Sequence, residues 1–193
     1  MIRAVRFILA SSSPRRRELL ASIGAEFDVI PSHVPEVRAG GESPEEYVAR
    51  LSREKANVIA EQHRDRWVIA ADTTVLLGDE LLEKPADPKD AERMLATIAG
   101  RTHVVYSGVT VQNVDAGYRE TRVAETEVRM SPMTGNDIAW YVATGEPLDK
   151  AGAYAAQGEG RRFIESIDGS ESNVIGLPLD ETLALLRAEG HPG

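Results

Sequence analysis

The 193-residue sequence contains no cysteine, and this absence excludes several kinds of chemistry at once. Without cysteine there is no disulfide framework, no thiolate nucleophile, and no zinc or iron–sulfur site built on sulfur ligands. Aromatic residues make up only 5% of the chain, and no apolar run approaches the ~20 residues that a membrane-spanning helix requires. We therefore expect a protein with no membrane partner, and the lack of cysteine favours a cytoplasmic location.

Basic residues are also scarce relative to acidic ones, with 22 Lys and Arg against 31 Asp and Glu and a net charge of −9. This balance argues against binding to a nucleic-acid polymer, which requires clustered lysine and arginine. Residues 1–60, however, hold nine basic and eight acidic side chains. A locally balanced or basic segment in an acidic protein suits a small, compact anion. The apolar run 7–10 is too short for a signal peptide.

Several common motifs are missing as well. The sequence has no G-x-x-x-x-G-K-[ST] phosphate loop and no G-x-S-x-G nucleophile elbow. The Gly158-Glu159-Gly160 segment lacks the third glycine and the preceding strand of a dinucleotide-binding fingerprint. The histidines show no metal-ligand spacing, so we expect each at the surface or satisfied in the core. They are His33, His63, His103 and His191.

What is present is an alternation of strand and helix patterns that predicts an α/β protein. The expected strands lie at 5–10, 27–30, 67–71, 75–77, 80–82, 103–114, 118–130 and 163–167. The expected helices lie at 14–23, 44–62, 88–100, 135–144 and 180–189. At ~100–200 residues per domain, the chain forms one domain of at most two intimate lobes. We expect a mixed central β-sheet flanked by helices, with two lobes around a cleft.

Three consecutive arginines follow the expected first strand, in the segment Ala10–Arg17. Ser13 is a good helix N-cap and Pro14 a good first helical residue. The arginines then lie in the first helical turn, where the helix dipole favours negative charge. A bound anion, held by hydroxyls, backbone N–H groups and guanidinium groups, would resolve this conflict. A capped helix with solvated arginines is the alternative.

Asp72 follows the apolar run Trp67–Ala71. An aspartate at the carboxyl end of a buried strand lies where open α/β sheets bind ligands. There it can hold a divalent cation or take a proton from water. A turn aspartate that bonds to its own backbone is the alternative.

Weaker signals come from two lysines and one glutamate. Pro85 keeps Lys84 extended, which gives its ammonium group a directed reach. An ordinary exposed lysine is the commoner case, and Lys55 has the same alternative on a solvated helix face. Glu36 lies in a loop with no informative spacing.

The segment Asp149–Gly158 has two glycines that flank Tyr154 and Gln157. Glycines at such positions permit a close approach of the backbone to a flat ligand. The Gln157 amide offers both donor and acceptor groups, which is what reading the edge of a base requires. A long surface loop is the alternative.

Together these segments resemble the Maf family of nucleoside-triphosphate pyrophosphatases. Residues 10–16 match the family hallmark A/G-S-x-S-P-R-R. The resemblance continues in order along the chain, at Arg53–Ala56, Ala71–Thr73, Leu82–Pro85, Asp149–Gly158 and Gly169–Leu179. It implies one Maf-like domain over residues 1–193, with the cleft-containing fold shared with inosine triphosphatases. It also implies hydrolysis of a nucleoside triphosphate with a divalent cation, Mg²⁺ or alternatively Mn²⁺ or Co²⁺.

The resemblance also implies roles for individual residues. Asp72 matches the catalytic proton acceptor, and the resemblance makes Asp72 and Glu36 metal ligands; whether Asp72 serves as base, ligand or both is left open. The positions tied to substrate choice are Arg15, Thr73 and Gln157. The residues that line the phosphate end are Ser13, Arg16, Lys55 and Lys84.

The Asp149–Gly158 segment resembles the dTTP/UTP branch of the family, although Glu171 stands where relatives often carry an aromatic residue. We therefore expect a cytoplasmic, homodimeric pyrophosphatase that converts dTTP and UTP, and modified pyrimidine triphosphates, to the monophosphate and pyrophosphate. This would be a house-cleaning role in nucleotide metabolism. One alternative is a 7-methyl-GTP pyrophosphatase. Another is a non-catalytic nucleotide-binding regulator of cell division, since the family has been named for inhibition of septum formation.

Overall fold

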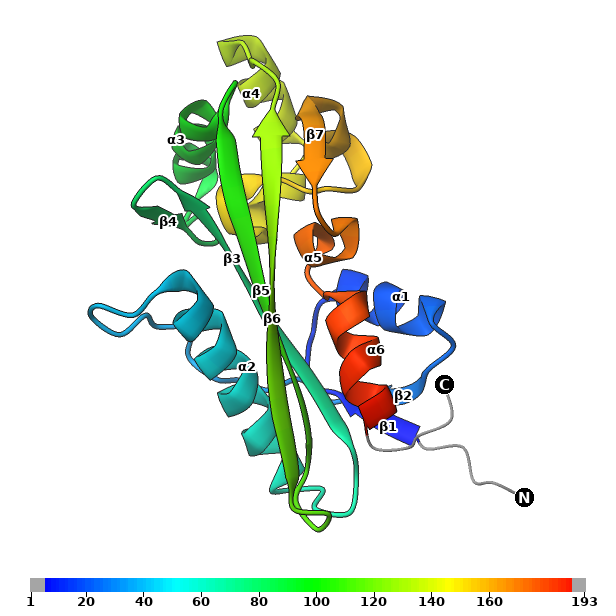
Figure 1. The fold of residues 1–193 in the computed structure, drawn as a ribbon. Coiled ribbons are helices and arrows are strands. Elements are labelled where there is room, and N and C mark those ends of the chain that lie inside the picture. The colour runs from blue at the N-terminus through cyan, green and yellow to red at the C-terminus, as the bar shows by residue number, and fades with distance from the viewer. Residues whose placement is uncertain (1–5, 189–193) are drawn as a thin grey trace. The chain divides into compact units, whose positions relative to one another are not determined.

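The structure is a computed structural model that describes residues 6–188 (Figure 1). The chain divides into two compact units. Unit 1 comprises the residues up to Asp72 together with 107–124 and the residues from Gly176 onward. Unit 2 comprises 73–106 and 125–175. The strands that run through both units are β3 (Val68–Leu77), β5 (Thr102–Asn113) and β6 (Tyr118–Met130).

The strands form one mixed, seven-stranded sheet, which confirms the expected α/β class. The other strands are β1 (Arg6–Leu9), β2 (Glu26–Val29), β4 (Glu80–Leu82) and β7 (Ile164–Asp168). Their order is β2–β1–β3–β5–β6–β7, with β4 paired to β3 outside that path. Strand β1 pairs in parallel with β2 and β3, whereas β4 pairs antiparallel with β3 and β7 antiparallel with β6.

The helices begin and end close to the residues that the capping signals predict. They are α1 (Pro14–Ser22), α2 (Pro44–Ala60), α3 (Pro88–Ile98), α4 (Gly135–Ala143), α5 (Glu171–Ile175) and α6 (Leu179–Ala188). The side chains of Ser13, Ser43 and Asp87 accept the expected N-cap hydrogen bonds. The expected ends of the first strand and the last helix, Val5 and Glu189, lie outside the described residues.

The sequence patterns did not predict the short helices around β7. The Gly-rich stretch before β7 contains short 3₁₀ helices, η1 (Glu146–Asp149), η2 (Ala151–Ala153) and η3 (Gly158–Phe163), and α5 follows β7. Turns of three to six residues produce no hydrophobic periodicity, so a pattern search does not detect them.

In unit 1, helices cover both faces of the sheet (Figure 1). Leu9 and Ile69 pack in a cluster with side chains of α1 and α6, whereas Ile8 and Val68 pack in a second cluster with side chains of α2. Successive residues of a strand point to opposite faces. A strand buried on both faces must therefore be continuously apolar, as residues 7–9 of β1 and the start of β3 are.

Polar contacts fix α2 on the sheet. The Ser52 and Thr110 hydroxyls lie 2.8 Å apart, and both side chains are fully buried. A side-chain carbon at Gly108 would come within 2.5 Å of the Val48 carbonyl oxygen. Glycine at this position of β5 therefore allows α2 to pack close to the sheet. The short distance between helix and sheet determines how far the α2 side chains lie from the strands.

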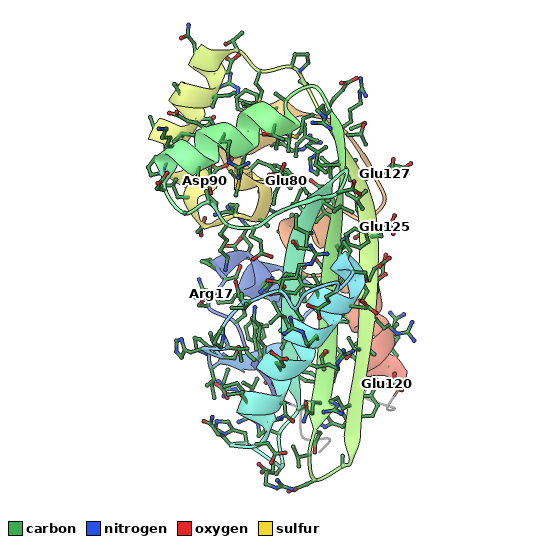
Figure 2. The ribbon with its side chains drawn as sticks, turned by 90° about the vertical axis from the view of Figure 1, so that its left-hand side faces the viewer. Arg17, Glu80, Asp90, Glu120, Glu125 and Glu127 are labelled. Atoms are coloured by element: carbon green, nitrogen blue, oxygen red, sulfur yellow. The ribbon has the colours of Figure 1, made fainter. Side chains whose placement is uncertain are left out.

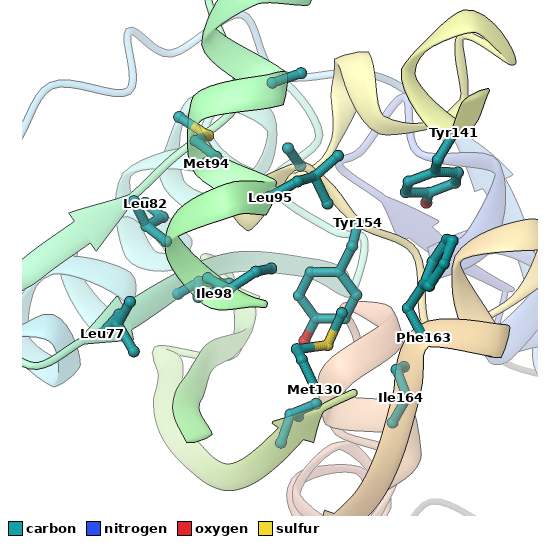
Figure 3. Close-up of a cluster of buried hydrophobic side chains, with 14 of the residues drawn as sticks. Leu77, Leu82, Met94, Leu95, Ile98, Met130, Tyr141, Tyr154, Phe163 and Ile164 are labelled. Carbon is teal, nitrogen blue, oxygen red and sulfur yellow. The ribbon is translucent and has the colours of Figure 1, made fainter. Parts of the chain in front are cut away.

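Unit 2 has a single apolar core between its part of the sheet, α3, α4 and the 3₁₀ segment. Figure 3 shows Tyr154 between the α3 side chains Leu95 and Ile98 and the ring of Phe163. In this unit β6 is buried on one face only: Val128 is buried, while Glu125 and Glu127 point outward (Figure 2).

Candidate active site

The central feature of unit 1 is a lysine between two carboxylates. The Lys55 ammonium donates to Asp72 Oδ1 at 2.5 Å and to Glu36 Oε1 at 2.6 Å. The Lys55 and Asp72 side chains are only 6% and 8% exposed, whereas Glu36 is 36% exposed. Charge-assisted hydrogen bonds of this length restrict all three groups to one arrangement. The structure thus brings together three residues that are 17 to 36 positions apart in sequence.

The alternative of a solvated Lys55 is wrong, because its side chain is buried. Lys55 lies on the buried stripe of α2, which is marked by Val48, Leu51, Ser52, Ala56 and Ile59. These residues recur at the three- and four-residue spacing of one helix face. Lys55 falls on the same face by this spacing. A lysine at a position where the pattern expects an apolar residue is therefore the sequence signal of its burial.

The expected position of Asp72 at a strand end is also wrong. Strand β3 continues through Asp72 to Leu77. The β-branched Thr73, Thr74 and Val75 favour extended backbone, and Val75 begins the pairing with β4. The pairing of β3 with β1 nevertheless stops at Ile69, so Asp72 lies beyond the last residue of its parallel neighbour.

Arg16 is the second cationic group of this site. The Ser13 side chain caps α1 by accepting from the Arg16 backbone N–H at 3.5 Å. The Arg16 guanidinium donates to the carbonyl oxygen of Gly176 at 2.7 Å and to the Ser11 hydroxyl at 3.5 Å. Arg16 therefore folds back from the helix start, whereas Arg17 is exposed (Figure 2).

Electrostatics link Arg16 to the lysine–carboxylate cluster. Burial lowers the pKa of Arg16, and the negative charges of Asp72 and Glu36 oppose this lowering. Arginine keeps its proton in proteins. The site therefore contains two positive and two negative side chains in a partly buried environment.

The loop between β2 and α2, which carries Glu36, is held by Arg50. The Arg50 guanidinium donates from Nε and Nη2 to the two carboxylate oxygens of Glu42 at 2.7 and 2.9 Å. It also donates to the Val37 carbonyl oxygen at 2.9 Å and to Glu54 at 3.1 Å. These hydrogen bonds lower the pKa of Glu42. Arg50 thus fixes the residue that follows Glu36.

Of the remaining predicted site residues, Thr73, Lys84 and Gln157 belong to unit 2, and Arg15 belongs to unit 1. Thr73 follows Asp72 on β3 and is half-buried. Lys84 and Gln157 are exposed. Their segments are joined by one hydrogen bond, from the Gly152 N–H to the Glu83 carbonyl oxygen at 3.1 Å. In unit 1, Arg15 is half-buried at the start of α1.

Gly152, one of the two glycines beside Tyr154, has a packing reason of its own and a positive φ of +70°. A side-chain carbon there would lie 3.1 Å from Val75, so packing explains this glycine. Tyr154 is buried, and its hydroxyl lies 2.8 Å from His103 Nε2. Burial raises the pKa of Tyr154 and lowers the pKa of His103 to about 4. His103 is thus a core histidine, which is one of the two cases that the sequence allows.

The site's donor set fits a magnesium ion. Among residues 6–188, no three His, Asp or Glu side chains gather as a metal site. Glu36 and Asp72, however, both contact Lys55 Nζ and so supply two neighbouring carboxylates. Mg²⁺ is commonly bound through one or two carboxylates together with substrate phosphates and water. Glu36 and Asp72 are therefore the residues that would hold it.

Sequence reasoning missed the residues that hold the site. Ser11 and the Gly176 carbonyl contact Arg16, and Arg50 and Glu42 support the Glu36 loop. Ser11 lies in the serine-rich segment before α1, so its motif was a usable signal. The others act through tertiary contacts between distant parts of the chain, which one sequence does not show.

Comparisons with known proteins extend over nearly the whole chain. A family model described as "Maf-like protein" matches residues 6–189. The "dTTP/UTP pyrophosphatase" of Myxococcus xanthus is 51% identical over 186 residues, which is 96% of this chain and 93% of that protein. Proteins with the same name from Anaeromyxobacter dehalogenans and Syntrophus aciditrophicus are 50% and 45% identical, over 98% and 96% of this chain and 96% and 90% of theirs.

A search of solved structures gives a more distant likeness. A HAM1 protein from Coxiella burnetii aligns with a TM-score of 0.49 and 14% identity, over 95% of this chain and 99% of that one. Among residues 6–188, no helix combines the length and apolar character that crossing a membrane requires.

Proposed function

The chain belongs to the Maf-like protein family, and from that premise we propose that it hydrolyses dTTP and UTP to the monophosphate and pyrophosphate. The observation that carries this proposal is the contact of the buried Lys55 ammonium with Asp72 and Glu36. Both carboxylates also interact electrostatically with Arg16. The names of relatives at 45–51% identity support the choice of dTTP and UTP. The role is the removal of surplus or modified pyrimidine triphosphates.

The charge of the substrate explains the cations of the site. A triphosphate carries about four negative charges, which a protein of net charge −9 repels unless local positive groups compensate. Arg16 and Lys55 supply positive charge in unit 1, and Ser13 adds a hydroxyl. Lys84 and Arg15 are the further proposed contacts of the phosphate and substrate.

In the proposed reaction, water attacks the α-phosphorus and the bond from that phosphorus to the α,β-bridging oxygen breaks. Pyrophosphate leaves with the electrons of that bond. The Asp72 carboxylate accepts the proton of the attacking water, while Lys55 holds the carboxylate in place. Phosphoryl transfer depends mainly on positioning and charge neutralisation. A positioned base contributes ~10²–10⁴-fold.

We also propose a divalent cation, with Mg²⁺ as the first candidate. When bound, it would neutralise phosphate charge and strengthen pyrophosphate as a leaving group. Glu36 and Asp72 are its proposed ligands. Asp72 serves in this proposal both as base and as metal ligand.

Base selection is assigned to Gln157, and Thr73 and Arg15 are proposed to share that role. The Gln157 side chain is exposed and has one acceptor and two donors. Uracil and thymine share an edge on which an N–H group lies between two carbonyl groups. A glutamine amide can pair with the N–H and one neighbouring carbonyl of that edge, and cytosine presents the reverse order of donor and acceptor.

The experiment is product analysis with a panel of triphosphates in ¹⁸O-labelled water. Purified protein and Mg²⁺ are incubated with dTTP, UTP, CTP, GTP and 7-methyl-GTP. We expect dTTP and UTP to give monophosphate and pyrophosphate, with the label in the monophosphate, and EDTA to abolish the reaction. Release of orthophosphate, label in pyrophosphate, or preference for 7-methyl-GTP would contradict the proposal. Sedimentation of the same sample tests the expected homodimer.

A further inference from the structure

The backbone just after Gln157 is held by the carboxylate of Glu146, a residue for which the proposed function gives no role. Glu146 lies at the start of η1 in unit 2. Its Oε2 accepts the backbone N–H of Glu159 at 3.0 Å, and its Oε1 accepts the N–H of Gly160 at 3.0 Å. These N–H groups belong to the first turn of η3, where a carboxylate is favoured.

The backbone just before Gln157 is held by Tyr141 of α4. The Tyr141 hydroxyl accepts the Ala155 N–H at 3.0 Å and donates to Glu146 Oε1 at 2.8 Å. The Tyr141 ring is fully buried and packs against Phe163 at 5.5 Å between ring centroids (Figure 3). One connected pair of side chains therefore fixes the backbone on both sides of Gln157.

Glycines leave room for this pair. Gly158 has φ +76°, and a side-chain carbon there would lie 2.5 Å from Glu146 Oε2. At Gly160, such a carbon would overlap the Tyr141 hydroxyl and the Ala155 carbonyl oxygen. The two glycines of the sequence Gln-Gly-Glu-Gly are thus required by the close contacts with Glu146 and Tyr141.

The pattern of burial shows what the pair achieves. Ala155, Ala156 and Gly160 are buried, while Gln157 and Glu159 are exposed. The backbone is fixed, but the Gln157 side chain is left accessible. A donor and acceptor set discriminates between bases only if it is held in one orientation before the ligand arrives.

We propose that Glu146 is a positioning residue for base selection, acting with Tyr141 through the backbone around Gln157. This inference rests on the proposed function, in which Gln157 pairs with the base. Glu146 does not touch the reacting atoms in this arrangement. Its loss therefore affects the choice among triphosphates more than the chemical step.

The test variant is Glu146→Gln, which keeps one acceptor oxygen and replaces the other with an amide nitrogen that cannot accept an N–H. Its matched control is Glu159→Gln, which removes the same charge from an exposed side chain of the same segment. We expect the preference for UTP over CTP, measured as the ratio of their kcat/KM values, to fall about tenfold in Glu146→Gln, which is the effect of losing one charged hydrogen bond. The control should keep the wild-type ratio.

Two further measurements separate positioning from general damage. Amide hydrogen exchange at residues 159 and 160 should accelerate in Glu146→Gln and not in Glu159→Gln. In a Gln157→Ala background, Glu146→Gln should cause no further loss of preference, because residues that act through one group are non-additive. If Glu146→Gln does not fold, Tyr141→Phe is measured in the same way, because it removes the hydroxyl and keeps the ring.

The outcomes distinguish the inference from the proposed function. Wild-type protein that does not hydrolyse UTP overturns both. A UTP-selective wild type whose selectivity survives in Glu146→Gln, or falls equally with and without Gln157, overturns the inference alone. Equal losses for all triphosphates in Glu146→Gln also overturn the inference and leave the proposed function standing.

Discussion

The two units hold their candidate site residues by different physical means. In unit 1, Lys55, Asp72 and Glu36 are held by charged hydrogen bonds to one another. In unit 2, the backbone beside Gln157 is hydrogen-bonded to Glu146 and Tyr141, and Tyr141 packs in the apolar core of that unit. One unit fixes charges, and the other fixes a stretch of backbone.

This difference follows from what each group is proposed to do. Burying charge carries a desolvation cost, and a buried ion pair is often no more stabilising than apolar residues of similar volume. Reactivity, rather than stability, therefore accounts for the Lys55 cluster. A neutral amide such as Gln157 needs no partner charge and only requires an ordered backbone. Variants of unit 1 should thus reduce turnover, and variants of unit 2 should alter selectivity.

The largest effect is expected for Asp72→Asn. Removal of the proposed base should lower kcat at least ~10²-fold. The fold should persist, because the asparagine oxygen still accepts from Lys55 and Glu36 remains its charged partner. Steady-state kinetics with UTP and a thermal melt check this. Asp28→Asn is the control, since Asp28 pairs with Arg66 in the same unit. A wild-type kcat in Asp72→Asn would show that Asp72 takes no part in the chemical step.

A somewhat smaller effect is expected for Arg16→Ala. The loss of a charged hydrogen bond to phosphate, about 1.5–3 kcal/mol, should raise the KM for UTP by roughly ten- to a hundredfold. Tm should also fall, because the bond to the Gly176 carbonyl oxygen is lost. Arg17→Ala removes the same charge from an exposed position and serves as the control. An unchanged KM together with a lowered Tm would make Arg16 purely structural.

Arg50→Ala should have a more moderate effect, because it acts on Glu36 only through the loop. We expect about a tenfold loss of kcat/KM, comparable to one charged hydrogen bond, and faster amide exchange over residues 37–42. Arg50→Lys should restore only part of the activity, since lysine cannot make the paired contact with Glu42. Arg53→Ala, at an exposed neighbouring position on α2, should match wild type. Normal activity with a loosened loop would show that Glu36 needs no support.

The smallest effect is expected from His103, which tests the core of unit 2. Its folded pKa of about 4 lies below the value of 6.5 for the unfolded chain. Between these values the unfolded state binds more protons, so the stability contribution is present above pH 6.5 and is lost as pH falls toward 4. From pH 7 to 5.5 the loss is about 1 kcal/mol, or roughly 2–4 °C in Tm. His103→Phe should flatten this slope, and the exposed His33→Gln should not.

Most regular elements could be predicted from the sequence because their signals are local. The Ser43 capping box and the prolines at 14, 44 and 88 mark helix starts directly. The long hairpin of β5 and β6 follows from two alternating stretches joined by a turn. The 3₁₀ helix η3 escaped prediction because its first turn is held by Glu146, a contact between segments that are distant in sequence.

The site was predictable in its residue types but not in its contacts. Serine before a helix, arginines in its first turn and aspartate after an apolar run are visible as local conflicts with ordinary preferences. The pairing of Lys55 with Asp72 joins a helix to a strand. The burial of Lys55 has a signal in the helical spacing, but only the fold shows that its ammonium group meets Asp72 and Glu36.

The most direct test of the contrast between the units compares Asp72→Asn with Gln157→Ala on UTP and CTP. The measurement is kcat/KM for each substrate, relative to wild type. We predict that Asp72→Asn lowers both values by the same factor of at least ~10², whereas Gln157→Ala lowers the value for UTP more than that for CTP. A base-dependent loss in Asp72→Asn, or an equal loss on both substrates in Gln157→Ala, would contradict this division of labour.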